Sequence, residues 1–400
     1  MGALSHIRVL DLSRILAGPW STQILGDLGA EVIKIEKPST GDDSRAWGPP
    51  WLKDDAGNDT SEAAYYASCN RNKKSVAIDI AQPEGRELIL ELAAKSDVFI
   101  ENFKVGGLKR YGLGYEDVKK LNPSIIYCSI TGFGQDGPYA ERPGYDFLIQ
   151  GMGGLMSLTG RPDGEPGAGP LKVGVALTDI LTGMYSTVAI LAALAHRDRT
   201  GEGQHIDLAL LDVQVACLAN QAMSYLASGE EPRRMGNAHP TVMPYQDFPT
   251  ADGYMILAIG NDSQFAKFSE VAGHPEWARD DRYRTNTARV ANRATLLPML
   301  QDATRTRTTE DWIMVLEKCS VPCGPINTLK TVFADPQVVH REMHVRIPHP
   351  LAGEVSMVAN PIHLSRTPVE YRNAPPTLGA DTQRNARIRA RTAQFANREA

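Results

Sequence analysis

Strand and helix patterns alternate along the first part of the chain, and this alternation constrains the fold more than any other feature. Residues 7–12 and 31–36 alternate apolar and polar side chains, as half-buried strands do. A helix pattern at 19–28 separates them, and Pro83 suits the first turn of another helix. Further strands are expected at residues 76–79, 97–101 and 125–130. This order predicts an α/β fold, with helices on the faces of a mostly parallel sheet.

The rest of the chain has a glycine-rich middle and then a second change in composition near Gly229. Glycine-rich segments at 131–134, 151–154 and 160–169 predict loops, and the run 151–154 is a candidate gate over a site. A long apolar helix is expected from Asp179, followed by a strand near His205. From about Gly229, Pro and Gly become frequent before new strand and helix patterns begin. We predict a large domain at 1–228, a smaller α+β domain at 229–334, and a segment at 335–400 that returns to the large domain and ends in a tail.

The composition excludes several classes of protein. With 42% hydrophobic and 22% charged residues, the chain resembles an ordinary globular protein. Its formal net charge of −5 lacks the basic excess of a nucleic-acid-binding protein. Five scattered cysteines favour a reducing compartment. The apolar stretch 180–195 is shorter than the ~20 residues of a membrane-spanning helix. We therefore expect a cytoplasmic protein that binds neither nucleic acid nor membrane.

Several standard catalytic signatures are missing. The chain has no GxGxxG after the first strand, no GxxxxGK[ST] loop and no GxSxG elbow. Cys319 and Cys323 are one residue too far apart for a CxxC pair, and no second Cys or His cluster follows in the sequence. Two core cysteines are therefore expected there, and no metal site.

Asp179 admits two interpretations. It follows a glycine-rich loop and begins the apolar helix. Asp is common as a helix N-cap, where it accepts hydrogen bonds from free backbone N–H groups. The same position would also suit a carboxylate nucleophile, because a substrate can approach closely and free N–H groups can stabilise an oxyanion.

Basic and polar residues gather near the predicted strands. Lys37 follows the second strand, Asn102 and Phe103 follow the fourth, and Arg110 comes soon after. The run 70–74 precedes the third strand. Ligands of open parallel sheets bind outside the carboxyl ends of the strands, and basic groups there suit a multiply phosphorylated ligand. The alternative is a solvated basic fringe.

Eight ordered segments resemble the family III CoA-transferases, the family of formyl-CoA transferase, carnitine CoA-transferase and α-methylacyl-CoA racemase. They are residues 7–13, 17–19, 28–38, 70–75, 98–103, 129–134, 178–183 and 196–204. The resemblance implies a large Rossmann-like domain, a small domain on long linkers, and a homodimer whose chains interlock. It implies no tightly bound cofactor, since CoA and acyl-CoA are substrates and a carboxylic acid is the second substrate.

The resemblance also assigns chemistry to Asp179, which matches the family's catalytic aspartate. This carboxylate would attack the donor thioester and form a mixed anhydride. The CoA thiolate would then convert the anhydride to an aspartyl-CoA thioester, which the acceptor acid attacks. The positions that match the family's CoA contacts are Ile15, Leu16, Ala17, Lys37, Arg71, Ile78, Asp79, Asn102, Phe103, Lys104, Arg110, Arg142 and Tyr145.

Two positions separate branches of the family. Leu16 stands where formyl-CoA transferase has Gln, which counts against a formyl or oxalyl substrate. Tyr145 replaces the His of the racemase Gly-His-Asp segment, which favours transfer over racemisation. An acyl-CoA racemase or epimerase remains the alternative, and a non-catalytic CoA-binding protein is a second alternative.

The segment 234–245 resembles family members that use succinyl-CoA and short dicarboxylic acids. His239, Arg71 and Arg142 are candidates for the second carboxylate of such an acceptor, although His239 is equally well explained as a turn residue before Pro240. We therefore expect CoA transfer from succinyl-CoA to a short carboxylic or dicarboxylic acid. The Arg-rich tail from Arg384 departs from the usual end of the family.

Overall fold

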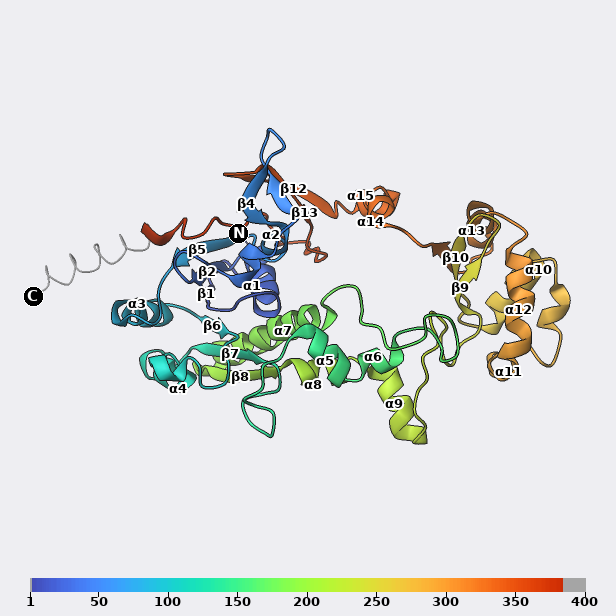
Figure 1. Cartoon of the computed structure of the whole chain (residues 1–400), viewed down its shortest axis with the longest axis horizontal. Coiled ribbons are helices and arrows are strands. Elements are labelled where there is room, and N and C mark those ends of the chain that lie inside the picture. The colour runs from blue at the N-terminus through green and yellow to red at the C-terminus, as the bar shows by residue number, and fades with distance from the viewer. Residues whose placement is uncertain (1, 384–400) are drawn as a thin grey trace, which may run out of the picture. The chain divides into compact units, whose positions relative to one another are not determined.

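The computed structural model describes residues 2–383, which form two compact units (Figure 1). Unit 1 contains the chain up to Leu155, Lys172–Glu230 and the chain from Gln337. Unit 2 contains Met156–Leu171 and Glu231–Pro336. The Arg-rich tail from Arg384 lies outside the described residues.

Six parallel strands form the central sheet of unit 1. They are β1 (Arg8–Asp11), β2 (Glu31–Glu36), β5 (Lys73–Ala77), β6 (Val98–Glu101), β7 (Ile126–Thr131) and β8 (Gln204–Ala209). Their order in space is β5-β2-β1-β6-β7-β8. Strand order therefore reverses between β1 and β6, as in doubly wound sheets, and leaves a crevice at the carboxyl ends of these two strands. The predicted α/β class with a parallel sheet is confirmed.

Helices cover both faces of this sheet. Helices α1 (Ala17–Asp27) and α7 (Leu177–Thr200) lie over one face, and α3 (Pro83–Ala93) and α4 (Tyr115–Leu121) lie over the other. Successive strand side chains point to opposite faces, so Val9 joins the first core and Leu10 joins the second. This double burial explains why the strands are rich in Val, Ile and Leu.

Helix α7 is the one helix among residues 2–383 that is long and apolar enough to cross a membrane. Ile190, Ala193 and Leu194 on this helix are nevertheless part of the buried core of unit 1. One face is thus buried, as expected, whereas side chains such as Met184 and Val188 are exposed on the other.

Shorter elements complete unit 1. They are β3 (Trp51–Lys53), β4 (Asp59–Ala63), α2 (Ala64–Ser68), α5 (Asp146–Met152), α8 (Leu210–Ala216), α9 (Ala219–Ser228), β12 (His344–His349) and β13 (Gly353–Val358). The segment 151–154, a candidate gate, is the end of α5 and a packed turn. A Cβ on Gly153 would lie 2.4 Å from Cγ of Gln214, so this glycine serves close packing rather than an open loop.

The chain after β13 covers the open edge of the central sheet. Asp381 N–H donates to the carbonyl of Ser75 in β5, and Ser75 N–H donates to the Asp381 carboxylate. Ala77 N–H donates to the hydroxyl of Thr382. These bonds pair backbone groups that an edge strand otherwise leaves free.

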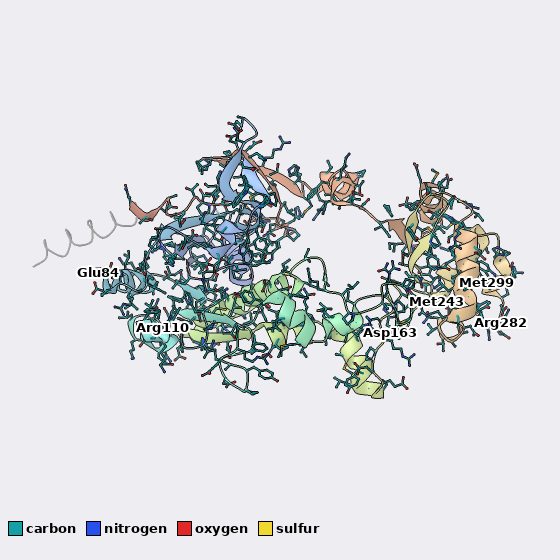
Figure 2. The ribbon with its side chains drawn as sticks, viewed as in Figure 1. Glu84, Arg110, Asp163, Met243, Arg282 and Met299 are labelled. Atoms are coloured by element: carbon teal, nitrogen blue, oxygen red, sulfur yellow. The ribbon has the colours of Figure 1, made fainter. Side chains whose placement is uncertain are left out.

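Unit 2 is built on a small antiparallel sheet. Its strands are β9 (Tyr245–Pro249), β10 (Tyr254–Ala258) and β11 (Cys323–Pro325), and its helices include α10 (Asp262–Val271), α11 (Asn286–Ala291), α12 (Arg293–Thr304) and α13 (Thr309–Lys318). Short helices α6 (Leu155–Leu158), α14 (Leu329–Val332) and α15 (Pro336–His340) lie near the unit boundaries. Met243 belongs to its core, and Met299, Cys319 and Cys323 are partly buried against it (Figure 2 labels both methionines).

Residues 156–171 belong to unit 2, although they lie inside the range 1–228 that the sequence assigned to the large domain. Gly236 N–H donates to the carbonyl of Gly160, and Arg234 pairs with Asp163, which is labelled in Figure 2. Both contacts join distant parts of the sequence, so local patterns carry no signal for them.

Arg71, a predicted CoA contact, is a structural residue. Its guanidinium is buried and donates to both carboxylate oxygens of Asp27, at 2.9 and 2.6 Å. It also donates to the carbonyl of Val358 and lies over the ring of Tyr371. Because Arg71 precedes β5, it lies at the amino end of the strand, away from the carboxyl ends that bind ligands.

Replacing Asp27 with Ala leaves the buried Arg71 charge without its partner. We expect the free energy of unfolding to fall by about 3–5 kcal/mol, as for other broken buried pairs. Urea unfolding followed by circular dichroism measures this loss. In the control Asp59→Ala, which breaks an exposed pair with Lys53, the loss should stay below about 1 kcal/mol. Equal losses in the two variants would contradict the assigned role.

Candidate active site

A cavity of 170 Å³ opens at the carboxyl ends of β1, β6 and β7. Its walls come from the loop after β1, the turn after β6, the end of β7, the segment before α5, and the first turn of α7. The lining residues are 14–17, 102–105, 130–132, 140, 142–145, Asp179 and Leu210. The cavity therefore occupies the crevice where ligands of doubly wound proteins bind.

Asn102 ties together the two loops that flank the crevice. Its side-chain oxygen accepts the N–H of Arg14 at 2.9 Å, and its amide nitrogen donates to the carbonyl of Arg14 at 2.8 Å. Glu101, at the end of β6, accepts the N–H of Phe103 at 2.7 Å. These three contacts fix the backbone that lines the cavity.

Asp179 lies in the first turn of α7, three residues after the N-cap Ala176. Its side chain lines the cavity, so the interpretation as an N-cap is wrong. The free N–H groups of the helix are capped from another element. Asp146, the first residue of α5, accepts the N–H of Thr178 at 2.8 Å and that of Asp179 at 3.4 Å.

The two carboxylates change the acidity of the site. Burial, together with repulsion from the Asp146 carboxylate, raises the pKa of Asp179 to about 7. Burial, together with the charge of Asp179, also raises the pKa of the Tyr65 phenol to about 12. At neutral pH the site therefore holds a carboxyl group that gains or loses a proton easily, near a phenol that keeps its own.

Side chains of α5 and α8 hold the segment that leads into α7. Gln150 donates to Asp146 at 2.7 Å and accepts the N–H of Val173 at 2.9 Å. The hydroxyl of Thr178 donates to Gln214 at 2.6 Å. The sequence alone did not indicate Asp146 as a site residue, although Asp146 directly follows Tyr145 in the segment that corresponds to the racemase Gly-His-Asp. The bonds that give Asp146 its role join residues 32 or more positions apart.

A second cavity of 460 Å³ adjoins the first, and Arg14 and Phe103 line both. Lys37, Ile78 and Asp79 line the second cavity. The two cavities together suit an elongated ligand with a reactive end at Asp179 and an anionic end near the cations Lys37 and Arg14.

Most predicted contact residues line one of these cavities. Those in the first are Ile15, Leu16, Ala17, Asn102, Phe103, Lys104, Arg142, Tyr145 and Asp179, and those in the second are Lys37, Ile78, Asp79 and again Phe103. Arg110 (labelled in Figure 2) is exposed. Its guanidinium lies over the ring of Tyr111, which lines the second cavity. Arg71 lines neither cavity. His239 belongs to unit 2 and forms a turn, in which its Nδ1 accepts the N–H of Thr241.

Fold and site together define a doubly wound α/β protein with a buried carboxyl group of raised pKa facing its switch-point crevice. The model of CoA-transferase family III matches residues 4–382, and the chain belongs to this family. It is therefore a CoA-transferase, an enzyme that uses CoA thioesters as substrates.

Named relatives cover nearly the whole chain. Succinate–glutarate CoA-transferase of Agrobacterium fabrum is 51% identical over 94% of this chain and 93% of its own. Human succinyl-CoA:glutarate CoA-transferase is 45% identical over 95% of this chain and 84% of its own. A crystal structure of a CaiB/BaiF family protein from Brucella suis is 52% identical, with a TM-score of 0.84 over 98% of this chain and 99% of that one.

Replacing Asp146 with Asn removes the neighbouring negative charge and keeps an oxygen that can accept from the N–H groups of α7. We expect the pKa of Asp179 to fall below its value of about 7. An infrared titration of the carboxyl stretch, taken as the difference from Asp179→Asn, measures this value. Asp198→Asn changes a carboxylate at the far end of α7 and should leave the titration unmoved. An unchanged pKa in Asp146→Asn would refute the coupling of the two carboxylates.

Proposed function

We propose that the protein transfers CoA from succinyl-CoA to glutarate or a related short dicarboxylic acid, with Asp179 as the nucleophile. The observation that carries this proposal is the Asp179 carboxyl group, which lines a small cavity and has a pKa near neutrality. The substrates named for the Agrobacterium and human relatives support the choice of acids.

The reaction exchanges acyl groups through two anhydrides and one thioester. The Asp179 carboxylate attacks the carbonyl of succinyl-CoA, the C–S bond breaks, and CoA leaves as a thiolate. The thiolate attacks the aspartyl carbonyl of the anhydride and releases succinate. The acceptor carboxylate then attacks the aspartyl thioester and again expels the thiolate. Attack of the thiolate on the acceptor carbonyl forms the new acyl-CoA and restores Asp179. No proton is gained or lost overall.

The two cavities divide the work of binding. In this proposal the phosphates of CoA lie in the larger cavity beside Lys37, and the thioester reaches the smaller cavity beside Asp179. The small volume of the cavity beside Asp179 favours the reaction, because water that entered this cavity would hydrolyse the anhydride.

Arg142 suits the distal carboxylate of a dicarboxylic acid. Its guanidinium lies over the rings of Tyr139 and Phe133, at 4.5 and 5.3 Å, and lines the same cavity as Asp179. Within residues 2–383 it forms no ion pair with a carboxylate. A cation that is fixed by aromatic rings and has no anionic partner fits a planar carboxylate group well.

Racemisation has less support. It needs a second base at the α-carbon, and none of the described residues that line the small cavity is a histidine. Tyr145, at the corresponding position, is 61% exposed and so faces solvent.

We further propose an interlocked homodimer in the cytoplasm. Each chain would have a large domain at about 1–228 that leaves out residues 156–171, a small domain at 229–334, and a return segment at 335–400. Exposed apolar side chains on neighbouring helices support association with a second copy. They are Phe147, Leu148, Met184, Tyr185, Val188, Val215, Met223 and Leu226. The five free cysteines suit a reducing compartment.

Intact-protein mass spectrometry after mixing with succinyl-CoA tests the covalent mechanism. We expect a CoA-sized adduct that hydroxylamine removes, because hydroxylamine cleaves thioesters. Asp179→Ala should form no adduct and lose at least ~10³-fold in transfer rate, as when other nucleophiles are removed. Formation of the same adduct in this variant would contradict the role of Asp179.

Replacing Arg142 with Gln tests the choice of acceptor. With glutarate, we expect kcat/KM to fall about 10–100-fold, which corresponds to loss of a charged hydrogen-bonded pair. With butyrate, which lacks the second carboxylate, the change should stay within about threefold. Arg142→Lys keeps the positive charge but loses the paired N–H donors of the guanidinium. Its kcat/KM with glutarate should therefore lie between the values of wild type and Arg142→Gln. Equal losses for both acids would show that Arg142 does not read the second carboxylate.

A further inference from the structure

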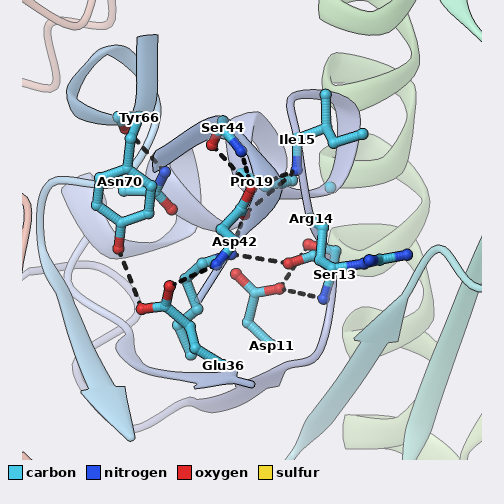
Figure 3. A network of polar contacts seen from close by, with 12 residues as sticks. Asp11, Ser13, Arg14, Ile15, Pro19, Glu36, Asp42, Ser44, Tyr66 and Asn70 are labelled. Atoms are coloured by element: carbon cyan, nitrogen blue, oxygen red, sulfur yellow. Dashed lines mark hydrogen bonds and ion pairs between the residues drawn. The ribbon is translucent and has the colours of Figure 1, made fainter. Parts of the chain in front are cut away.

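The loop at residues 13–17 lies on a buried cluster of charges (Figure 3). Asp11, Lys34, Asp42 and Lys73 are all buried, and they come from different strands and loops. Lys34 Nζ lies 2.9 Å from Asp42 Oδ2, and Lys73 Nζ lies 3.4 Å from Asp11 Oδ2. Buried ion pairs stabilise a fold weakly, because desolvation costs nearly as much as the pairing gains. Two such pairs beneath one loop therefore call for an explanation beyond stability.

Ile15 adopts a conformation that is unfavourable for its side chain. Its φ of 73° lies in the left-handed region, where a β-branched residue is rare and costs about 1–3 kcal/mol. Such strain persists only where neighbouring contacts impose it. In Figure 3, Asp42 provides the contact, since its Oδ1 and Oδ2 accept the N–H of Ile15 at 3.1 and 3.2 Å.

The Asp42–Lys34 pair holds the backbone of the strained residue and of the loop just before it. Lys34 Nζ donates to the carbonyl of Ser13 at 2.8 Å, while Asp42 accepts the N–H of Ile15. Asp42 is itself fixed, because it accepts from the N–H and the hydroxyl of Ser44 at 2.9 and 2.7 Å. Burial alone would raise the pKa of Asp42, but the charge of Lys34 lowers it well below its usual value, so the carboxylate stays ionised.

The strained turn determines where one wall of the small cavity lies. Ile15, Leu16 and Ala17 line the cavity that Asp179 also lines. Relaxation of Ile15 to a common conformation would redirect the chain just before α1 begins at Ala17. The residues that surround the thioester would then move relative to the nucleophile, and small displacements from a reactive geometry slow catalysis strongly.

We propose that Asp42, together with Lys34, is a positioning residue of the transfer reaction, which keeps Ile15 in its left-handed conformation and thereby holds the wall 15–17 against Asp179. This inference rests on the proposed function of Asp179. Asp42 lines the larger cavity and does not line the smaller one, so its effect on the chemistry passes through Ile15.

The test combines Asp42→Asn with Ile15→Gly. We expect Asp42→Asn to lower kcat and the rate of aspartyl-thioester formation at least tenfold, and to change KM for succinyl-CoA less than threefold. Adding Ile15→Gly should restore kcat at least threefold, because glycine adopts a φ of 73° without strain. A purely stabilising Asp42 predicts no rescue, since glycine only adds flexibility to the loop.

Asp97→Asn is the matched control. Asp97 also accepts a backbone N–H from another strand, that of Arg8 at 2.7 Å, and pairs with a cation, Arg197, at 2.7 Å. It precedes β6 at the amino ends of the strands, away from both cavities. This variant should lower the melting temperature and leave kcat within twofold of wild type. If Asp42→Asn does not fold, Ser44→Ala, which removes one bond to Asp42, should lower kcat about threefold.

Three results would overturn the inference. The first is an unchanged kcat in Asp42→Asn. If Asp42→Asn does not fold, an unchanged kcat in Ser44→Ala has the same meaning. The second is a loss of kcat that Ile15→Gly does not restore. In both cases wild type still forms the adduct, so the proposed function stands. The third is a wild-type enzyme that forms no adduct, which would overturn the proposed function and this inference together.

Discussion

The close contact between α1 and α7 brings the reactive parts of the site together. A Cβ on Gly183 would lie 2.6 Å from the carbonyl oxygen of Ala17, so only glycine allows the two helices to approach this far. One turn further along α7, Thr187 and Ser21 share a hydrogen bond of 3.1 Å between their hydroxyls. Asp179 lies one turn before Gly183, and the loop 13–17 ends where α1 begins. The contact therefore brings the carboxyl group and the cavity wall to the same place.

Carboxylates in unit 1 divide into two electrostatic groups. Asp42 and Asp11 face buried lysines, and although burial opposes ionisation, these cations keep the pKa values of both carboxylates below their usual range. Among residues 2–383, no cation forms an ion pair with Asp179, and burial with a neighbouring carboxylate raises its pKa. A compensated carboxylate such as Asp42 can hold the backbone while it stays ionised. Asp179 lacks this compensation and lines a cavity, and perturbed acids in cavities tend to mark active sites.

Site residues are predicted best from the sequence where the parallel sheet alone determines the position of a residue. Residues that follow β2 and β6, such as Lys37 and Asn102, line the cavities because the carboxyl ends of parallel strands share one edge. Arg71, which the family resemblance assigned to CoA, lines neither cavity, because it precedes β5 and therefore lies at the amino end of that strand. Asp42 and Asp146 escaped notice because their partners, Ile15 and Thr178, are distant in sequence.

A pKa near 7 is compatible with a nucleophilic role for Asp179. At neutral pH about half of the carboxyl groups are ionised, so protonation costs only about a factor of two in reactive enzyme. The burial that raises the pKa also removes water from the carboxylate, and a desolvated anion attacks a thioester more readily. In the proposed mechanism, the same exclusion of water protects the anhydride intermediate. Acidity, reactivity and protection of the intermediate thus share one physical cause, the small cavity at the switch point of the sheet.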